Sequence, residues 1–211
     1  GLLDMAVALA AAYFLYKGQG SSLWLPFEKH AVVVPAGLYV AGAAMLLWFT
    51  MNATNCSDGV DGLAGTLTLL SLFALAGLLY GVVGYKPVAN YLLIPHNPDG
   101  ARWAIFVATT AGALAGYLWH NAEPSRVLMG DAGSRLLGML VGVAVLVAGN
   151  PFLIIVVSPV VLVNGGTGLF KLILLRGLRR IGFDVRPTHT LKPEDAERQF
   201  VLVKALHSVR F

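Results

Sequence analysis

The sequence predicts an all-α fold, a polytopic transmembrane helix bundle, and three observations support this class. Of the 211 residues, 57% are hydrophobic and only 12% are charged, whereas soluble domains carry about 25% charged residues. The apolar residues gather in runs that approach the roughly 20 residues a helix needs to cross a bilayer. These runs are apolar on every side, while the strands of a membrane barrel would alternate. We therefore expect an integral membrane protein.

About six runs are expected to span the membrane as one bundle over residues 1–175. The first run is short, but it lacks the basic start and cleavage site of a signal peptide, so we interpret it as a helix. The fifth ends at Asn150-Pro151, because proline interrupts a helix. The expected spans cover residues 2–16, 31–51, 63–83, 103–120, 136–149 and 152–175.

Two connections are expected on one face of the bundle. Residues 17–30 contain Trp24 among other apolar side chains, a composition typical of the membrane interface. Residues 85–102 contain an Asn-Pro-Asp-Gly sequence that is compatible with a small hairpin. A plain surface connection is the simpler interpretation of both.

The end of the chain, residues 176–211, has a different composition and is predicted to be a basic cytoplasmic loop. A helix starting near Pro193 would place an apolar stripe against the membrane lipids, made by Val201, Leu202, Ala205 and Leu206. The arginines that follow residue 175 would then meet anionic lipid head groups. The alternative is that they bind substrate phosphate.

Two short acidic islands interrupt the apolar runs. The first, residues 52–63, contains Asp58 and Asp61, and the second, residues 121–135, contains Asp131. Carboxylates are costly near a bilayer, so acids in such positions usually mark function. Glycines flank the acids in both islands and allow a ligand to approach the backbone closely.

Counting the expected spans places both islands on one side of the membrane. Two spans separate the islands, and two more return the chain to the same side. The cations expected on the opposite face are only Lys17, Lys29, Lys86 and Arg102. The other 11 of the 15 Lys and Arg residues lie on the side of the islands. The positive-inside rule predicts that this side is cytoplasmic.

The residue types in the islands favour a magnesium site for a phosphorylated substrate. Asp58 and Asp61 are three positions apart and can address one site. Carboxylates without clustered Cys or His favour a hard cation such as Mg²⁺, which commonly bridges a carboxylate to phosphate. The asparagines of the islands suit a base, a ribose or a sugar, and a following helix would direct its positive end at an anion. Asp58, Asp61 and Asp131 are therefore the predicted catalytic residues.

Both islands resemble motifs of a known family. Residues 55–63, Asn-Cys-Ser-Asp-Gly-Val-Asp-Gly-Leu, resemble the Asn-Leu-Thr-Asp-Gly-Leu-Asp-Gly-Leu signature of the polyprenyl-phosphate N-acetylhexosamine-1-phosphate transferases. Asn121-Ala-Glu-Pro and the sequence Val-Leu-Met-Gly-Asp-Ala-Gly-Ser at residues 127–134 resemble the second cytoplasmic motif of that family. The resemblance runs from about residue 24 to residue 180.

The resemblance implies an enzyme of the bacterial inner membrane with its site on the cytoplasmic side. The loop at residues 85–102 is most similar to the branch that begins the membrane stage of peptidoglycan synthesis. In that reaction undecaprenyl phosphate attacks the sugar-proximal phosphate of UDP-N-acetylmuramoyl-pentapeptide and releases UMP. Mg²⁺ would neutralise the diphosphate. UDP-N-acetylglucosamine remains the alternative donor.

The resemblance also implies roles for individual residues. Asp131 would be the magnesium ligand, and Asp58 and Asn121 would lie beside the ribose and the diphosphate. The family often has Phe where this chain has Leu128, which can make apolar contact with the uracil but offers no aromatic face. The uridine pocket would be formed by Asn55, Gly59, Val60 and Asp61.

Several expectations lie outside these motifs. The family carries an Asp-Asp pair before the helix that opens this chain and a His-rich loop near its end, so we expect a piece of a longer enzyme that has no turnover alone. Asp4 is not expected to replace the pair. Dimers are common in the family, which allows a homodimer, and we expect no nucleic-acid partner. The alternative classes are a cation- or proton-coupled transporter and a membrane scaffold without catalysis.

Overall fold

The computed structural model describes residues 2–25, 31–121 and 125–181, and these residues form an all-α bundle, as the sequence predicts. Their only strands are the two-residue β1 (Ser22–Leu23) and β2 (Val32–Val33), which pair antiparallel. The helices are α1 (Leu2–Gln19), α2 (Ala36–Ser57), α3 (Leu63–Leu78), α4 (Lys86–Tyr91), α5 (Gly100–Asn121), α6 (Gly130–Val147), α7 (Leu153–Val157) and α8 (Pro159–Arg180). A π-helical turn, η1 (Leu79–Val83), continues α3.

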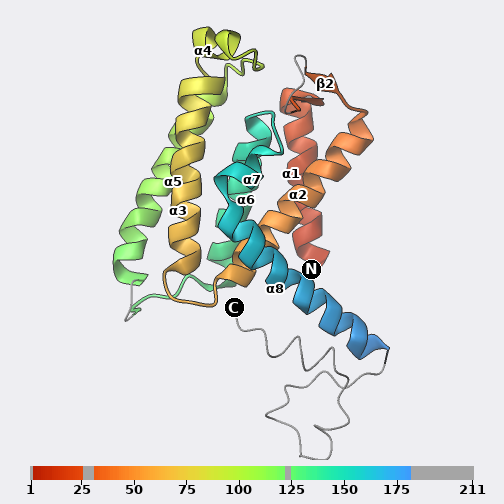
Figure 1. The fold of residues 1–211 in the computed structure, drawn as a ribbon, viewed down its shortest axis with the longest axis vertical. Coiled ribbons are helices and arrows are strands. Elements are labelled where there is room, and N and C mark those ends of the chain that lie inside the picture. Colours follow the sequence, from red (N-terminus) through yellow and green to blue (C-terminus); the bar gives the residue numbers. More distant parts are fainter. Residues whose placement is uncertain (1, 26–30, 122–124, 182–211) are drawn as a thin grey trace, which may run out of the picture.

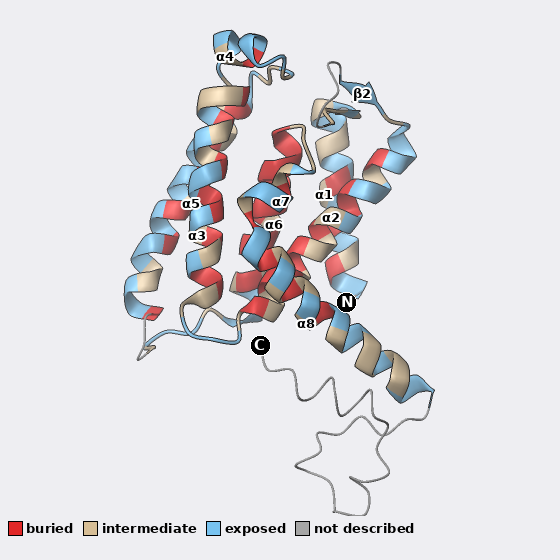
Figure 2. Ribbon diagram, viewed as in Figure 1, coloured by how far each residue is buried: buried red, intermediate tan, exposed pale blue. Residues whose placement is uncertain are grey.

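Helix α2 is the central element of the bundle. It packs against α1, α6 and α8, whereas α3 packs mainly against α5 (Figure 1). Helix α6 is the most enclosed, because residues 140–148 are buried without interruption (Figure 2). This explains why its sequence is apolar on all sides.

Small residues allow α2 to approach its neighbours closely. A Cβ atom added to Gly138 of α6 would lie 2.5 Å from the backbone oxygen of Thr50. One added to Gly165 of α8 would collide with the backbone of Ala53. Membrane helices lack a strong hydrophobic drive to associate and depend on such close backbone packing. These contacts fix the C-terminal half of α2, from which the first island emerges.

Four helical segments in the described ranges are long and apolar enough to cross a membrane: Ala36–Ser57, Leu63–Val83, Gly130–Val147 and Pro159–Arg180. The chain is thus a multi-pass membrane protein. Helix α1 and helix α5 fall outside this set, although both run beside the others in the bundle (Figure 1). Helix α1 carries the charged Asp4 and Lys17 near its ends. Hydropathy therefore supports four of the six expected spans.

The prediction of one continuous span over residues 152–175 is wrong, because the helix is interrupted at Ser158. Pro159 starts a new helix and cannot donate a backbone hydrogen bond to the preceding turn. Ser71 of α3 donates to the backbone oxygen of Val157 at 3.1 Å and accepts a 2.6 Å hydrogen bond from Ser158. The break directs α8 away from the bundle (Figure 1).

Helix α8 also extends beyond the expected end of the bundle at residue 175. It continues to Arg180, so Arg176, Arg179 and Arg180 lie on the helix instead of in a loop. The last helical turns therefore carry the basic charge, which is favourable beside the negative end of a helix dipole. The amphipathic helix predicted near Pro193 lies outside the described residues.

The two islands lie at the same end of the bundle, as the count of spans predicts. The end of α2, the start of α3, the end of α5 and the start of α6 all meet there, at the lower end in Figure 1. The strands and α4 lie at the opposite end. A short helix, α4, occupies residues 86–91 where a small hairpin was considered, and the only hairpin of the described residues joins β1 to β2.

Candidate functional site

The two acidic islands line one hollow, although about 60 residues and helices α3, α4 and α5 separate them in the sequence. The hollow encloses about 290 Å³, close to the lower end of the range for ligand pockets. Most of the predicted site residues line it, including all three acids. Its wall is made by Asp58, Gly59, Val60, Asp61, Asn121, Leu128, Met129, Gly130 and Asp131.

Each island contains a left-handed glycine at the start of the next helix. Gly62 precedes α3 with φ +75°, and Gly130 is the first residue of α6 with φ +67°. Side chains with a Cβ rarely adopt this conformation, which explains glycine at these two positions. Gly130 and Asp131 at the N-terminal end of α6 line the hollow, and the dipole of this helix favours an anion there.

Asn121 joins the two islands through its side chain. Its Oδ1 accepts a 2.9 Å hydrogen bond from the backbone nitrogen of Gly62. Its Nδ2 donates to the backbone oxygen of Val127 at 2.7 Å and to the Ser125 hydroxyl at 3.2 Å. The side chain is buried, and both ends of the amide are used within the protein. Asn121 thus holds the hollow together, and its predicted contact with substrate stays a prediction.

Asn55 lies behind the hollow instead of on its wall. Its Oδ1 accepts a 2.9 Å hydrogen bond from the hydroxyl of Ser134, which is fully buried. This bond ties the end of α2 to the first turns of α6. Asn55 is absent from the residues that line the hollow, so the geometry gives it a supporting position. Its predicted contact with uridine remains untested.

Negative charge is concentrated at the hollow. Burial raises the pKa of Asp58 above its ordinary value, and the negative charges of Asp131 and Asp61 raise it further. Asp61 and Asp131 therefore each lie close enough to Asp58 to repel its charged form. A cation at the hollow would relieve this repulsion.

The acids fit a magnesium ion that completes its shell with phosphate and water. Within the described ranges, no three His, Cys, Asp or Glu side chains form a ready-made metal cage. Mg²⁺ usually binds through one or two carboxylates and substrate phosphates, so it does not need such a cage. The Asp131 side chain is accessible to a cation, with 79% of its surface exposed.

Apolar side chains share the hollow with the carboxylates. Val60 and Leu128 are 58% and 77% exposed, and Met129 lines the wall between them and the start of α6. Such exposed aliphatic groups in a polar hollow can contact the flat face of a ligand. Met129 was not predicted as a site residue, and only its place within the second island could have indicated it.

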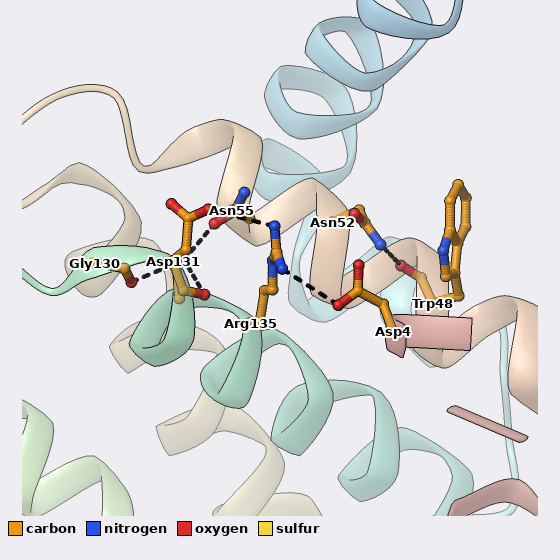
Figure 3. A network of polar contacts seen from close by, with 8 residues as sticks. Asp4, Trp48, Asn52, Asn55, Gly130, Asp131 and Arg135 are labelled. Carbon is orange, nitrogen blue, oxygen red and sulfur yellow. Dashed lines mark hydrogen bonds and ion pairs between the residues drawn. The ribbon is translucent and has the colours of Figure 1, made fainter. Parts of the chain in front are cut away.

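Sequence reasoning missed a charged network behind Asp131. Arg135 donates through Nη2 to Oδ2 of Asp131 at 3.4 Å and through Nη1 to Oδ1 of Asp4 at 3.3 Å (Figure 3). Asp4 therefore has a charged partner that also contacts Asp131. Whether Asp4 could replace the acidic pair of the family stays a prediction. Two signals could have found the network. Arg135 follows Asp131 by four residues, and an acid in the first turn of an apolar membrane helix normally requires a partner.

Comparison with known proteins is consistent with this site. The profile of glycosyl transferase family 4 matches residues 2–149. The chain is 50% identical to phospho-N-acetylmuramoyl-pentapeptide-transferase of Treponema pallidum (strain Nichols) over 179 residues, 83% of this chain and 49% of that protein. It is 38% identical to the protein of the same name from Nautilia profundicola over 158 residues, 74% of this chain and 45% of the relative.

A third protein of that name, from Leptospira biflexa, is 34% identical over 165 residues, 72% of this chain and 44% of the relative. The chain spans about half the length of the curated relatives it matches. The match to the family profile includes both acidic islands and covers more than half of the chain. The chain belongs to glycosyl transferase family 4.

Proposed function

We propose that the full-length protein transfers phospho-N-acetylmuramoyl-pentapeptide from its UDP conjugate to undecaprenyl phosphate. The reaction releases UMP and forms a pyrophosphate-linked lipid, the first membrane intermediate of peptidoglycan. The observation that carries the proposal is the convergence of Asp58, Asp61 and Asp131 on one hollow at one end of a membrane bundle. The name shared by the curated relatives supports this donor over UDP-N-acetylglucosamine.

The hollow provides distinct environments for the parts of a nucleotide sugar. Asp61, Gly59 and Val60 would border the uridine, with Asn55 in support from behind. Leu128 would make apolar contact with the base. Asp58 and Asn121 would lie beside the ribose and the diphosphate, close to the positive ends of α3 and α6.

Asp131 would hold Mg²⁺, which would neutralise the diphosphate and the charge that develops on the leaving phosphate. Asp131 lies in the first turn of α6, where its carboxylate is stabilised by the helix dipole. The surrounding islands would orient the donor so that the lipid phosphate can approach from the membrane. Orientation of this kind supplies much of what phosphoryl transfer requires from a protein.

The site would open to the cytoplasm of the bacterial inner membrane. The last turn of α8 carries Arg179 and Arg180 at the same end as the hollow, and basic residues are enriched on the cytoplasmic side. A transporter would be expected to place its acids near the middle of the membrane. Here the acids lie at helix ends, which favours the enzyme.

Release of UMP from purified full-length protein in detergent tests the proposal. We expect release that requires both undecaprenyl phosphate and Mg²⁺ when UDP-N-acetylmuramoyl-pentapeptide is the donor. UDP-N-acetylglucosamine should give little release under the same conditions. Preference for this second donor would mean that the protein is an N-acetylglucosamine-1-phosphate transferase of the alternative branch.

Replacing both Asp58 and Asp61 with alanine distinguishes an enzyme from a membrane scaffold without catalysis. The double variant should fold and enter the membrane but lose UMP release, because the negative wall of the hollow is gone. Unchanged release from the double variant, or no release from the unmodified protein with either donor, would contradict the proposed function.

A further inference from the structure

We infer that Asp4 is a positioning residue that acts on the magnesium ligand through Arg135. The inference rests on the proposed role of Asp131 in holding Mg²⁺. The Arg135 guanidinium lies between two carboxylates from different helices, at 3.3 Å from Asp4 and 3.4 Å from Asp131 (Figure 3). Asp4 holds the guanidinium back, so that Asp131 keeps one oxygen available for a cation.

The two carboxylates differ strongly in exposure. The Asp4 side chain is 6% exposed, and that of Asp131 is 79% exposed. An ion pair at an exposed position is screened by water and contributes little, whereas a buried pair feels a lower dielectric constant. The attachment of Arg135 to Asp4 is therefore the stronger of its two contacts.

The contacts with these two acids set the direction in which the Arg135 guanidinium points. One terminal nitrogen faces each carboxylate, so neither pair uses the two parallel hydrogen bonds of a full arginine-carboxylate fork. The third guanidinium nitrogen, Nε, is buried and meets no acceptor among the described residues. Without Asp4, the guanidinium is free to turn and close on Asp131 with both terminal nitrogens.

This arrangement has a specific consequence for the cation. In the observed position Arg135 contacts only Oδ2 of Asp131, and Oδ1 remains available. A guanidinium that closed on both oxygens would compete directly with a metal for the same carboxylate. Asp4 thus preserves metal access to Asp131 from a helix that does not line the hollow.

Binding of Mn²⁺, as a paramagnetic probe for Mg²⁺, tests this inference without turnover. Free Mn²⁺ is measured by electron paramagnetic resonance during titration of the full-length protein, and the relevant site is the one removed by Asp131→Asn. Asp4→Asn should weaken binding at this site about fivefold, since an exposed ion pair must then be broken. Arg135→Gln should bind Mn²⁺ as tightly as the unmodified protein or more tightly.

The double variant gives the decisive result. Asp4→Asn combined with Arg135→Gln should regain the Mn²⁺ affinity of Arg135→Gln, because the competing guanidinium is absent. A purely structural role for Asp4 would leave the double variant as weak as Asp4→Asn, and that result would overturn the inference. So would Mn²⁺ binding in the unmodified protein that Asp131→Asn does not remove.

Arg102→Gln serves as the matched control. Arg102 also pairs with an aspartate, Asp99, but at the opposite end of the bundle, so its loss should leave Mn²⁺ binding unchanged. The Mn²⁺ titration needs neither donor nor lipid acceptor. Failure of UMP release with the expected Mn²⁺ pattern would therefore count against the proposed function and leave the role of Asp4 intact.

Discussion

The two ends of the bundle each carry a polar hollow of nearly the same size. The hollow between the islands encloses about 290 Å³. The hollow at the opposite end encloses about 310 Å³ and is lined by residues of the β1 and α6 ends and of the segment at residues 95–99. Volume and polarity therefore do not distinguish a candidate site from a gap between loops.

The two hollows differ in the number of acids in their linings and in the segments that supply these acids. In the hollow at the opposite end, which we call the outer hollow, Asp99 is the only acid among the described residues of the lining, and it pairs with Arg102 at 3.1 Å. The hollow between the islands collects three carboxylates from two separate segments, and within the described residues only Asp131 of these three forms an ion pair. Concentrated charge that the protein does not neutralise indicates a site for a cation and an anionic ligand.

The largest expected difference between the two ends is in catalysis. Asp131→Asn should lower Mg²⁺-dependent UMP release by roughly 10³-fold or more, because it removes the proposed metal ligand. Asp99→Asn removes the acid of the outer hollow and should change the rate less than twofold. Rate measurements on both full-length variants check the pair, and retained turnover in Asp131→Asn would contradict its assignment.

The next difference concerns two asparagines that bridge segments. Asn121→Ala breaks the bond between the islands, and Asn97→Ala breaks a 3.1 Å bond to the backbone oxygen of Val147 in the outer hollow. Each should cost about 1–2 kcal/mol of stability. Only Asn121→Ala should also weaken UMP binding, measured by calorimetry. Equal UMP affinity in both variants would show that the tie between the islands does not shape the nucleotide site.

A smaller effect is expected from Asp58→Asn. The pKa of Asp58 is raised in the folded protein, so folding favours its protonated form, and stability falls as pH rises through the window between the unfolded and folded pKa values. Asparagine carries no charge and does not experience this repulsion or the cost of burying a charge. The neutral asparagine should therefore raise the melting temperature of the magnesium-free protein by about 1–2 °C. Thermal scans at neutral and mildly acidic pH check this, and the gain should shrink in acid.

The smallest effect is expected from Arg102→Gln. The side chains of Arg102 and Asp99 are 85% and 59% exposed, and such surface pairs contribute about 0–1 kcal/mol. Neither the melting temperature nor UMP release should change measurably. A large loss of stability would mean that this exposed ion pair holds together the end of the bundle opposite the islands.

Sequence reasoning identified the islands but not the contacts that support them. The acids and glycines of residues 52–63 and 121–135 can be recognised because carboxylates are rare in apolar surroundings. The hydrogen bond from Ser134 to Asn55 joins positions 79 residues apart, and no local pattern predicts such a pairing. An acid in an apolar helix indicates that Asp4 has a partner, but nothing local identifies Arg135, which is 131 residues away, as that partner.

The break at Ser158 shows a different limit. Pro159 in the sequence indicates that a helix starts there, but an apolar run of more than 20 residues also suggests one continuous span. Interhelical hydrogen bonds decide between these readings. Ser71 of α3 satisfies the backbone oxygen of Val157 that the break leaves open, which makes the interruption tolerable inside a membrane.

The sequence by itself determined the membrane class, the two islands, their common side and the family resemblance. These follow from composition, from an even number of spans between the islands and from residue identity. All three are properties of the linear sequence. The tertiary structure decided that Asn121 is used to join the islands, that Asn55 lies behind the hollow, and that Asp4 reaches the site through Arg135. Such contacts depend on how closely helices pack and in which direction side chains point. Both are set by the bundle as a whole.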